Sequence, residues 1–233
     1  MKQKEILSNT QPKNNFLMEE TDHLGEEHIG TSADTPLRPD AFELDDDTKI
    51  KLISEHFKEI MHILGLDLTD DSLKGTPKRV AKMYVKEIFS GLNPDNFPDV
   101  QLFENKYNYK EMLVEKDIQF YSNCEHHFVP IVGKAHVAYV SSGKVIGLSK
   151  INRIVQHFAK RPQVQERLTE QIAACMKEVL QTEDVAVVID AVHLCVSSRG
   201  IKDTSSQTVT SHFSGVFKNE ERKNEFFTYI QNK

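Results

Sequence analysis

Cysteine is scarce in this chain, with only three among its 233 residues. Three cysteines do not make a disulfide framework at this length, so we expect Cys124, Cys175 and Cys195 to be reduced thiols of a cytosolic protein. Long apolar runs are also lacking: no stretch reaches about 18 apolar residues, and we expect no membrane-spanning helix. The first ten residues carry lysines but no apolar segment before a small-residue cleavage site, which argues against secretion.

The body of the chain lacks any large excess of basic residues. The net charge is −6, and residues 1–47 hold four basic and twelve acidic residues. Residues 48–233 are nearly neutral, with 25 basic and 23 acidic residues, which argues against nonspecific nucleic-acid binding. A small anionic substrate is compatible with this balance if basic side chains converge on one pocket.

Residues 1–47 are polar and acidic, with few apolar positions in any periodic pattern. Such a segment buries too little apolar surface to offset its chain entropy, so we predict a disordered or loosely attached extension. A solubilising tail is the simpler interpretation, and a regulatory arm is the alternative. We divide the remainder into a helical region, 48–110, and a sheet-containing domain, 111–233.

Two helices are expected first. Apolar residues recur at spacings of three and four from Asp46 onward, and Gly65 closes that helix. Thr76 is expected as an N-cap, with Pro77 at the first helical position of a second helix that runs to about Phe89.

The pattern after residue 110 becomes rich in strands. Strands are expected at 112–121, 131–140, 184–197 and 207–217, with a helix capped by Ser149, a longer helix at 164–180 and a short helix at the end. The order β-β-α-α-β-β indicates an antiparallel sheet with helices on one face, an α+β fold.

Two short patterns bring together residues that bind metals. Cys124 and His127 have a Cys-x-x-His spacing that lets both side chains reach one Zn²⁺ ion, while the adjacent His126 points elsewhere. His193 and Cys195 are two apart in an expected strand, so both side chains would share one face, roughly 6.6 Å apart. The sequence thus offers five candidates for a site that needs three or four ligands.

A set of two cysteines and one histidine would leave one zinc position open for water, as catalytic zinc sites do, and two histidines for proton transfer. Taken singly, each residue has a simpler interpretation, as a core cysteine or a hydrogen-bonded strand histidine. A cysteine nucleophile activated by histidine is another alternative, but it uses only one of the two cysteines.

Basic residues near expected helix starts suggest an anion site. Ser149, Lys150 and Arg153 would place backbone N–H groups and two cations beside a phosphate, although composition alone slightly favours an ordinary amphipathic helix with exposed basic residues. Arg199, after the expected strand, would supply a further phosphate contact. Glu166 either interacts with the helix dipole or accepts two hydrogen bonds from guanine.

Five stretches resemble signatures of the GTP cyclohydrolase I family, in that family's order and over roughly residues 48–230. They are TPKRVAKMY (76–84), CEHH (124–127), GLSKINRIV (147–155), RPQVQERL (161–168) and AVHLC (191–195).

The resemblance implies one zinc ion per subunit, bound by Cys124, His127 and Cys195, with His126 and His193 as catalytic residues. It also implies conversion of GTP and water to 7,8-dihydroneopterin triphosphate and formate, the first step of folate and pterin biosynthesis. The implied substrate contacts are Ser149, Lys150, Arg153, Gln165, Glu166, Arg199 and Arg79.

The fold implied by the resemblance is the tunnelling fold, in which sheets of several subunits join edge to edge into a barrel. Family members form homodecamers of two pentamers with active sites at subunit junctions, so a neighbouring chain would supply some phosphate contacts. Two alternatives are another tunnelling-fold enzyme, acting on pterins or deazapurines, and a noncatalytic assembly protein stabilised by zinc.

Overall fold

The structure is a computed structural model that describes residues 32–231. Most of the predicted acidic extension, residues 1–47, lies outside the described residues. The predicted boundaries between the extension, the helical region 48–110 and the domain 111–233 stay predictions.

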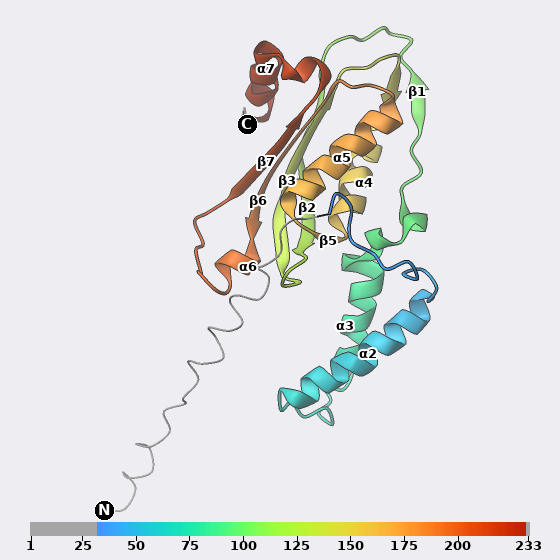
Figure 1. Ribbon diagram of the computed structural model, residues 1–233, viewed down its shortest axis with the longest axis vertical. Helices are drawn as coiled ribbons and strands as arrows, with labels where there is room; N and C mark the ends of the chain where they lie inside the picture. Colours follow the sequence, from blue (N-terminus) through green and yellow to red (C-terminus); the bar gives the residue numbers. More distant parts are fainter. Residues whose placement is uncertain (1–31, 232–233) are drawn as a thin grey trace, which may run out of the picture. The chain divides into compact units, whose positions relative to one another are not determined.

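The first part of the described chain is helical (Figure 1). Its elements are α2 (Asp46–Ile63), α3 (Thr76–Met83), a π-helical turn (Tyr84–Ile88) and two short 3₁₀ turns (Ser90–Leu92 and Pro94–Asn96). Both predicted helices are therefore present. The cap predicted for the second helix is wrong by one position, because Gly75 is the N-cap and Thr76 is already the first helical residue.

The rest of the chain contains the predicted strands and helices in the predicted order, together with three short strands and one short helix that were not predicted. The strands are β1 (Leu102–Glu104), β2 (Leu113–Cys124), β3 (Pro130–Tyr139), β4 (Lys144–Ile146), β5 (Pro162–Gln163), β6 (Val185–His193) and β7 (Thr208–Phe213). The helices are α4 (Leu148–Ala159), α5 (Gln165–Leu180), α6 (Leu194–Ser197), a 3₁₀ turn (Gly215–Lys218) and α7 (Glu220–Gln231).

The main sheet has the strand order β5-β2-β3-β6-β7, and β1 pairs with β4 in a separate small sheet. The pairs β2–β3, β3–β6 and β6–β7 are antiparallel, as the sequence predicts. The short strand β5 adds one parallel pairing to β2, so the sheet is mixed. This parallel pairing brings the start of α5 to the end of β2, where the candidate metal ligands lie.

Helices α4 and α5 pack on one face of the main sheet (Figure 1). Fully buried residues of these helices meet alternate residues of β3 and β6, as the two-residue period of a strand requires. Helix α7 packs on the opposite face of the sheet. Phe226 of α7 and Phe217 of the preceding 3₁₀ turn pack there with buried residues of β3 and β6, namely Ala138, Ala186 and Val188. The expectation that helices cover a single face is therefore wrong for the last helix, since the strands alternate apolar residues on both faces at that end of the sheet.

Helix α4 starts differently from the prediction. Its N-cap is Gly147, no side chain caps it, and Ser149 lies exposed in its first turn. The predicted cap by Ser149 is therefore wrong. Leu148 already has a helical backbone, so Ser149 is too far into the helix to accept the N–H bonds that an N-cap accepts.

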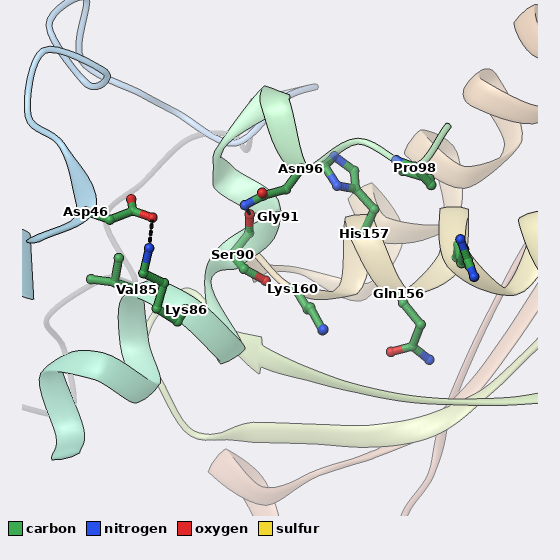
Figure 2. A pocket seen from close by; sticks show the side chains of 11 residues that line it. Asp46, Val85, Lys86, Ser90, Gly91, Asn96, Pro98, Gln156, His157 and Lys160 are labelled. Carbon is green, nitrogen blue, oxygen red and sulfur yellow. Dashed lines mark hydrogen bonds and ion pairs between the residues drawn. The ribbon is translucent and has the colours of Figure 1, made fainter. Parts of the chain in front are cut away.

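The helical region contacts the C-terminal end of α4 at Gly91, whose backbone lies against the backbone of His157 and Lys160 (Figure 2). A Cβ atom at this position would lie 2.0 Å from the carbonyl oxygen of His157, so only glycine fits. The Gly91 amide donates to the carbonyl of Lys160, and Arg161 Nε donates to the carbonyl of Gly91. Arg161 Nη2 also lies 2.8 Å from His157 Nε2, which must then accept the hydrogen bond.

Buried His157 makes the stability of this joint sensitive to acid. Burial, together with the positive charge of Arg161, lowers the pKa of His157 from 6.5 to about 4. The unfolded chain therefore binds a proton between pH 6.5 and 4 that the folded chain excludes, so the free energy of unfolding falls as the pH falls. We expect a loss of about 2–3 kcal/mol between pH 7 and pH 4 from this group.

Urea unfolding of His157→Gln at several pH values checks this expectation, with the exposed His62→Gln as the matched control. His157→Gln should show a shallower fall in unfolding free energy below pH 6.5 than the native chain, and His62→Gln should not. Equal pH slopes for all three proteins would contradict the assignment.

Candidate metal centre and active site

A tight turn at the end of β2 gathers the first two candidate ligands. The amide of Phe128 donates to the carbonyl of Cys124, and the amide of Cys124 donates to the carbonyl of Val129. Phe128 has a φ of 53°, in the left-handed region. Asn123 supports the turn from the strand, since its Nδ2 donates to the carbonyl of Phe128. The turn thereby places Cys124 and His127 on the same side of the loop.

The third candidate ligand reaches the site from a helix rather than from a strand. Strand β6 ends at His193, and Cys195 lies in the short helix α6, so the prediction that both side chains share one strand face is wrong. His193 is paired with Ile131 across the sheet, which puts the end of β6 beside the start of β3. The helical turn after His193 then directs Cys195 toward the loop that precedes β3.

The ligand atoms of Cys124, His127 and Cys195 all lie within 4.8 Å of one another. Burial and the neighbouring Cys124 raise the pKa of the Cys195 thiol to about 11. A dication bound between the two sulfur atoms would reverse this effect by favouring both thiolates. Two thiols and an imidazole are donors that zinc prefers, and three protein ligands leave one coordination position for water. The residues present therefore fit a zinc ion.

The two adjacent histidines have different surroundings. His126 is exposed, with Nδ1 3.7 Å from Cys124 Sγ and Nε2 3.9 Å from a carboxylate oxygen of Glu125. His127 has Nδ1 4.0 Å from Cys124 Sγ, while its Nε2 accepts a hydrogen bond from Arg199 Nη1 at 2.9 Å. Partial burial and the charge of Arg199 lower the pKa of His127, so its neutral form, which metals bind, is favoured.

His193 lies against the start of helix α5. Its Nε2 is 2.8 Å from Gln165 Oε1. Burial lowers the pKa of His193, and the negative charge of Glu166 acts in the opposite direction. Glu166 is exposed in the first turn of α5, beside the buried Gln165. The structure thus brings His193, Gln165 and Glu166 to one place.

A buried ion pair, which the sequence analysis did not predict, lies beside the metal loop, the segment 124–127 at the end of β2. Arg167 Nη1 and Nη2 lie 2.5 and 3.2 Å from the two carboxylate oxygens of Glu125. The Arg167 side chain is 2% exposed and that of Glu125 is 18% exposed. Glu125 stands between Cys124 and His126, so the pair ties the metal loop to helix α5. The sequence signal was available, since both residues lie within family-like stretches.

The remaining predicted substrate contacts do not gather at the metal ligands within the described chain. Lys150 Nζ donates to the carbonyl of Asp99, and Arg79 Nη2 donates to Ser72 and Thr76. Arg153 lines a cavity of about 470 Å³ next to Lys86 and Lys160, and no described metal-ligand candidate lines that cavity.

The three cysteines are free, as predicted, and no helix described between residues 32 and 231 is long and apolar enough to cross a membrane. The fold and the site define an α+β protein whose sheet carries three clustered candidate metal ligands, a set consistent with the zinc sites of catalytic enzymes.

Comparisons with known proteins identify the family. The family model of GTP cyclohydrolase I matches residues 53–231. A GTP cyclohydrolase 1 of Flavobacterium johnsoniae is 60% identical over 210 residues, which cover 90% of this chain and 94% of the relative. The enzyme of the same name from an Enterobacter species is 55% identical, covering 85% of this chain and 90% of the relative. One from Escherichia coli is 54% identical, covering 87% and 92%.

This chain belongs to the GTP cyclohydrolase I family. Membership also assigns the tunnelling fold to its mixed sheet and flanking helices.

Proposed function

We propose that this chain opens the imidazole ring of guanine in GTP by hydrolysis, giving 7,8-dihydroneopterin triphosphate and formate. The observation that carries the proposal is the cluster of Cys124, His127 and Cys195 beside His193, in a chain 60% identical to a GTP cyclohydrolase 1 over 90% of its length. The reaction would begin folate and pterin biosynthesis.

Cys124, His127 and Cys195 would hold one zinc ion per chain. When bound, zinc supplies a Lewis acid that lowers the pKa of a water molecule to about 7. The turn at the end of β2 and the start of α6 hold the three side chains in place, so little rearrangement is needed for binding.

The two remaining histidines would move protons. His193 would protonate the imidazole ring of guanine, which makes C8 electrophilic, and would stay oriented by Gln165. His126, exposed at the tip of the loop, would exchange protons during ring opening and the release of formate. Glu166 would accept hydrogen bonds from the guanine N1–H and its exocyclic amine, because its carboxylate is exposed close to His193.

The triphosphate would be bound by the basic residues together with residues of another copy of the chain. Arg199 is exposed beside His127 and would contact phosphate from the same chain. Within their own chain, Lys150 contacts Asp99, Arg79 contacts Ser72, Arg153 lines a separate cavity and Ser149 is exposed in the first turn of α4. A homodecamer of two pentamers would bring them to the metal centre of a neighbour and would also cover the edge strand β7.

Turnover of GTP by the purified chain tests the proposal, with the pterin product followed by its fluorescence after oxidation. Product should form with GTP, disappear after treatment with a zinc chelator and return when zinc is added back. ATP is the matched control substrate, since it lacks the N1–H and the exocyclic amine at C2, and it should give no product.

The same measurement separates the alternatives. Stoichiometric zinc with no product from GTP would overturn the proposal in favour of a zinc-stabilised assembly protein or a related enzyme. Product formation that survives complete removal of zinc would overturn the assigned metal centre.

A further inference from the structure

Gln165 is a fully buried polar residue at the first position of α5, and its side chain is hydrogen-bonded on both ends. The residue is 1% exposed. Its Nε2 lies 2.8 Å from the carbonyl oxygen of Thr208, 3.2 Å from that of Ile189 and 3.1 Å from Thr210 Oγ1. Its Oε1 lies 2.8 Å from His193 Nε2. The amide thus connects α5 to β6, to β7 and to the proposed catalytic histidine.

The surroundings determine which way this amide faces. Backbone carbonyl oxygens only accept hydrogen bonds, so the side that faces Thr208 and Ile189 must be the NH₂ group. The opposite orientation would place the Gln165 carbonyl oxygen against two backbone carbonyl oxygens in a buried site, where two acceptors repel each other and form no hydrogen bond. Gln165 Oε1 therefore faces His193.

This orientation decides the tautomer of His193. Oε1 of an amide has no hydrogen to donate, so His193 Nε2 must carry the hydrogen in their 2.8 Å contact. A neutral imidazole has one N–H, and its other nitrogen has a lone pair. His193 Nδ1 is therefore the nitrogen without a hydrogen when the ring is neutral.

We propose that Gln165 is a positioning residue that holds His193 in the Nε2–H tautomer and makes Nδ1 the nitrogen that exchanges a proton with the substrate. The proposal rests on the proposed function for the identity of the substrate. It assigns Gln165 a role different from the substrate contact that the family resemblance implies, since the described side chain is buried and all its hydrogen-bonding groups face protein atoms.

The proton balance of the step is simple. The imidazolium form of His193 carries hydrogens on both nitrogens, and the Nε2 hydrogen stays in its bond to Gln165. The Nδ1–H bond breaks, its electron pair stays on Nδ1, and the proton goes to a ring nitrogen of the guanine imidazole. The neutral ring that remains is already the tautomer that Gln165 stabilises, so no ring flip or second proton shift is needed.

The tautomer itself can be measured without turnover. Solid-state ¹⁵N NMR of the protein with ring-labelled histidine, recorded near pH 8.5 where imidazoles are neutral, distinguishes protonated from unprotonated ring nitrogens. The signals of His193 are those lost in His193→Ala. We expect Nε2 protonated and Nδ1 unprotonated in the native chain, and the Nδ1–H tautomer as the main form would overturn the proposal.

The kinetic test uses Gln165→Met, which keeps the length of the side chain and removes both hydrogen-bonding groups. We expect kcat to fall about 10- to 100-fold with KM within about threefold, unchanged zinc content and a mixture of His193 tautomers. The matched control is Gln171→Met, another buried glutamine of α5, whose side chain is hydrogen-bonded to Gln163 and Asp34 and not to a histidine. It should keep kcat within about twofold.

The other outcomes of this test decide against the proposal. A raised KM with unchanged kcat and an unchanged His193 tautomer would make Gln165 a substrate contact instead. Equal losses of kcat in Gln165→Met and Gln171→Met would mean a general packing effect. Absence of turnover in the native chain would overturn the proposed function alone, because the tautomer in the native spectrum still tests the role of Gln165.

Discussion

His193→Ala is expected to lower kcat/KM for GTP by about 10²- to 10⁴-fold, which is the usual contribution of a positioned general acid or base. The physical reason is that His193 is not among the clustered ligand candidates: its Nε2 is hydrogen-bonded to Gln165, while the cluster consists of Cys124, His127 and Cys195. The variant should therefore fold and bind zinc like the native chain.

Cys195→Ala is the matched comparison, because it removes a ligand two residues away on the same segment. It should lose both zinc and turnover, whereas His193→Ala should lose turnover alone. Steady-state kinetics and zinc content, measured on the same preparations, check the two results together. Substantial turnover by zinc-loaded His193→Ala would remove His193 from the mechanism, and loss of zinc from that variant would make His193 a ligand.

Arg167→Met is expected to destabilise the fold by about 3–5 kcal/mol, since it leaves the Glu125 carboxylate in a largely buried position without its guanidinium partner. The same change should weaken zinc binding, because Glu125 lies between Cys124 and His126 in the metal loop. Replacing both charges, in Arg167→Met with Glu125→Gln, should recover much of the lost stability, since no uncompensated charge stays buried.

The matched control is Lys177→Met on the same helix. Lys177 pairs with Glu183 at 3.1 Å, but Glu183 is 77% exposed, so the loss should stay below about 1 kcal/mol. Denaturant unfolding and competition with a zinc chelator measure the two effects. A cost for Arg167→Met no larger than that for Lys177→Met would show that the buried pair does not hold the loop.

Local patterns in the sequence were sufficient for the order of the longer elements and for the pairing of Cys124 with His127 as candidate metal ligands. The three-to-four residue spacing of apolar side chains predicted α2, and Pro162 separates α4 from α5 because proline cannot continue a helix. Cys124 and His127 are three residues apart, and such a spacing brings two side chains together in any tight turn. These features depend on neighbours along the chain, so the sequence alone determined them.

Contacts between distant segments were decided only by the tertiary structure. His193 and Gln165 are 28 residues apart and Arg167 and Glu125 are 42 apart, so each contact depends on how α5 lies across the sheet. Strand β6 ends at His193, whereas the sequence predicted a strand to residue 197, and the residues that follow form the short helix α6 that carries Cys195. The chemistry of the site follows from residue types in the sequence, whereas the orientation of its histidines follows from hydrogen bonds that exist only once the sheet and α5 have packed.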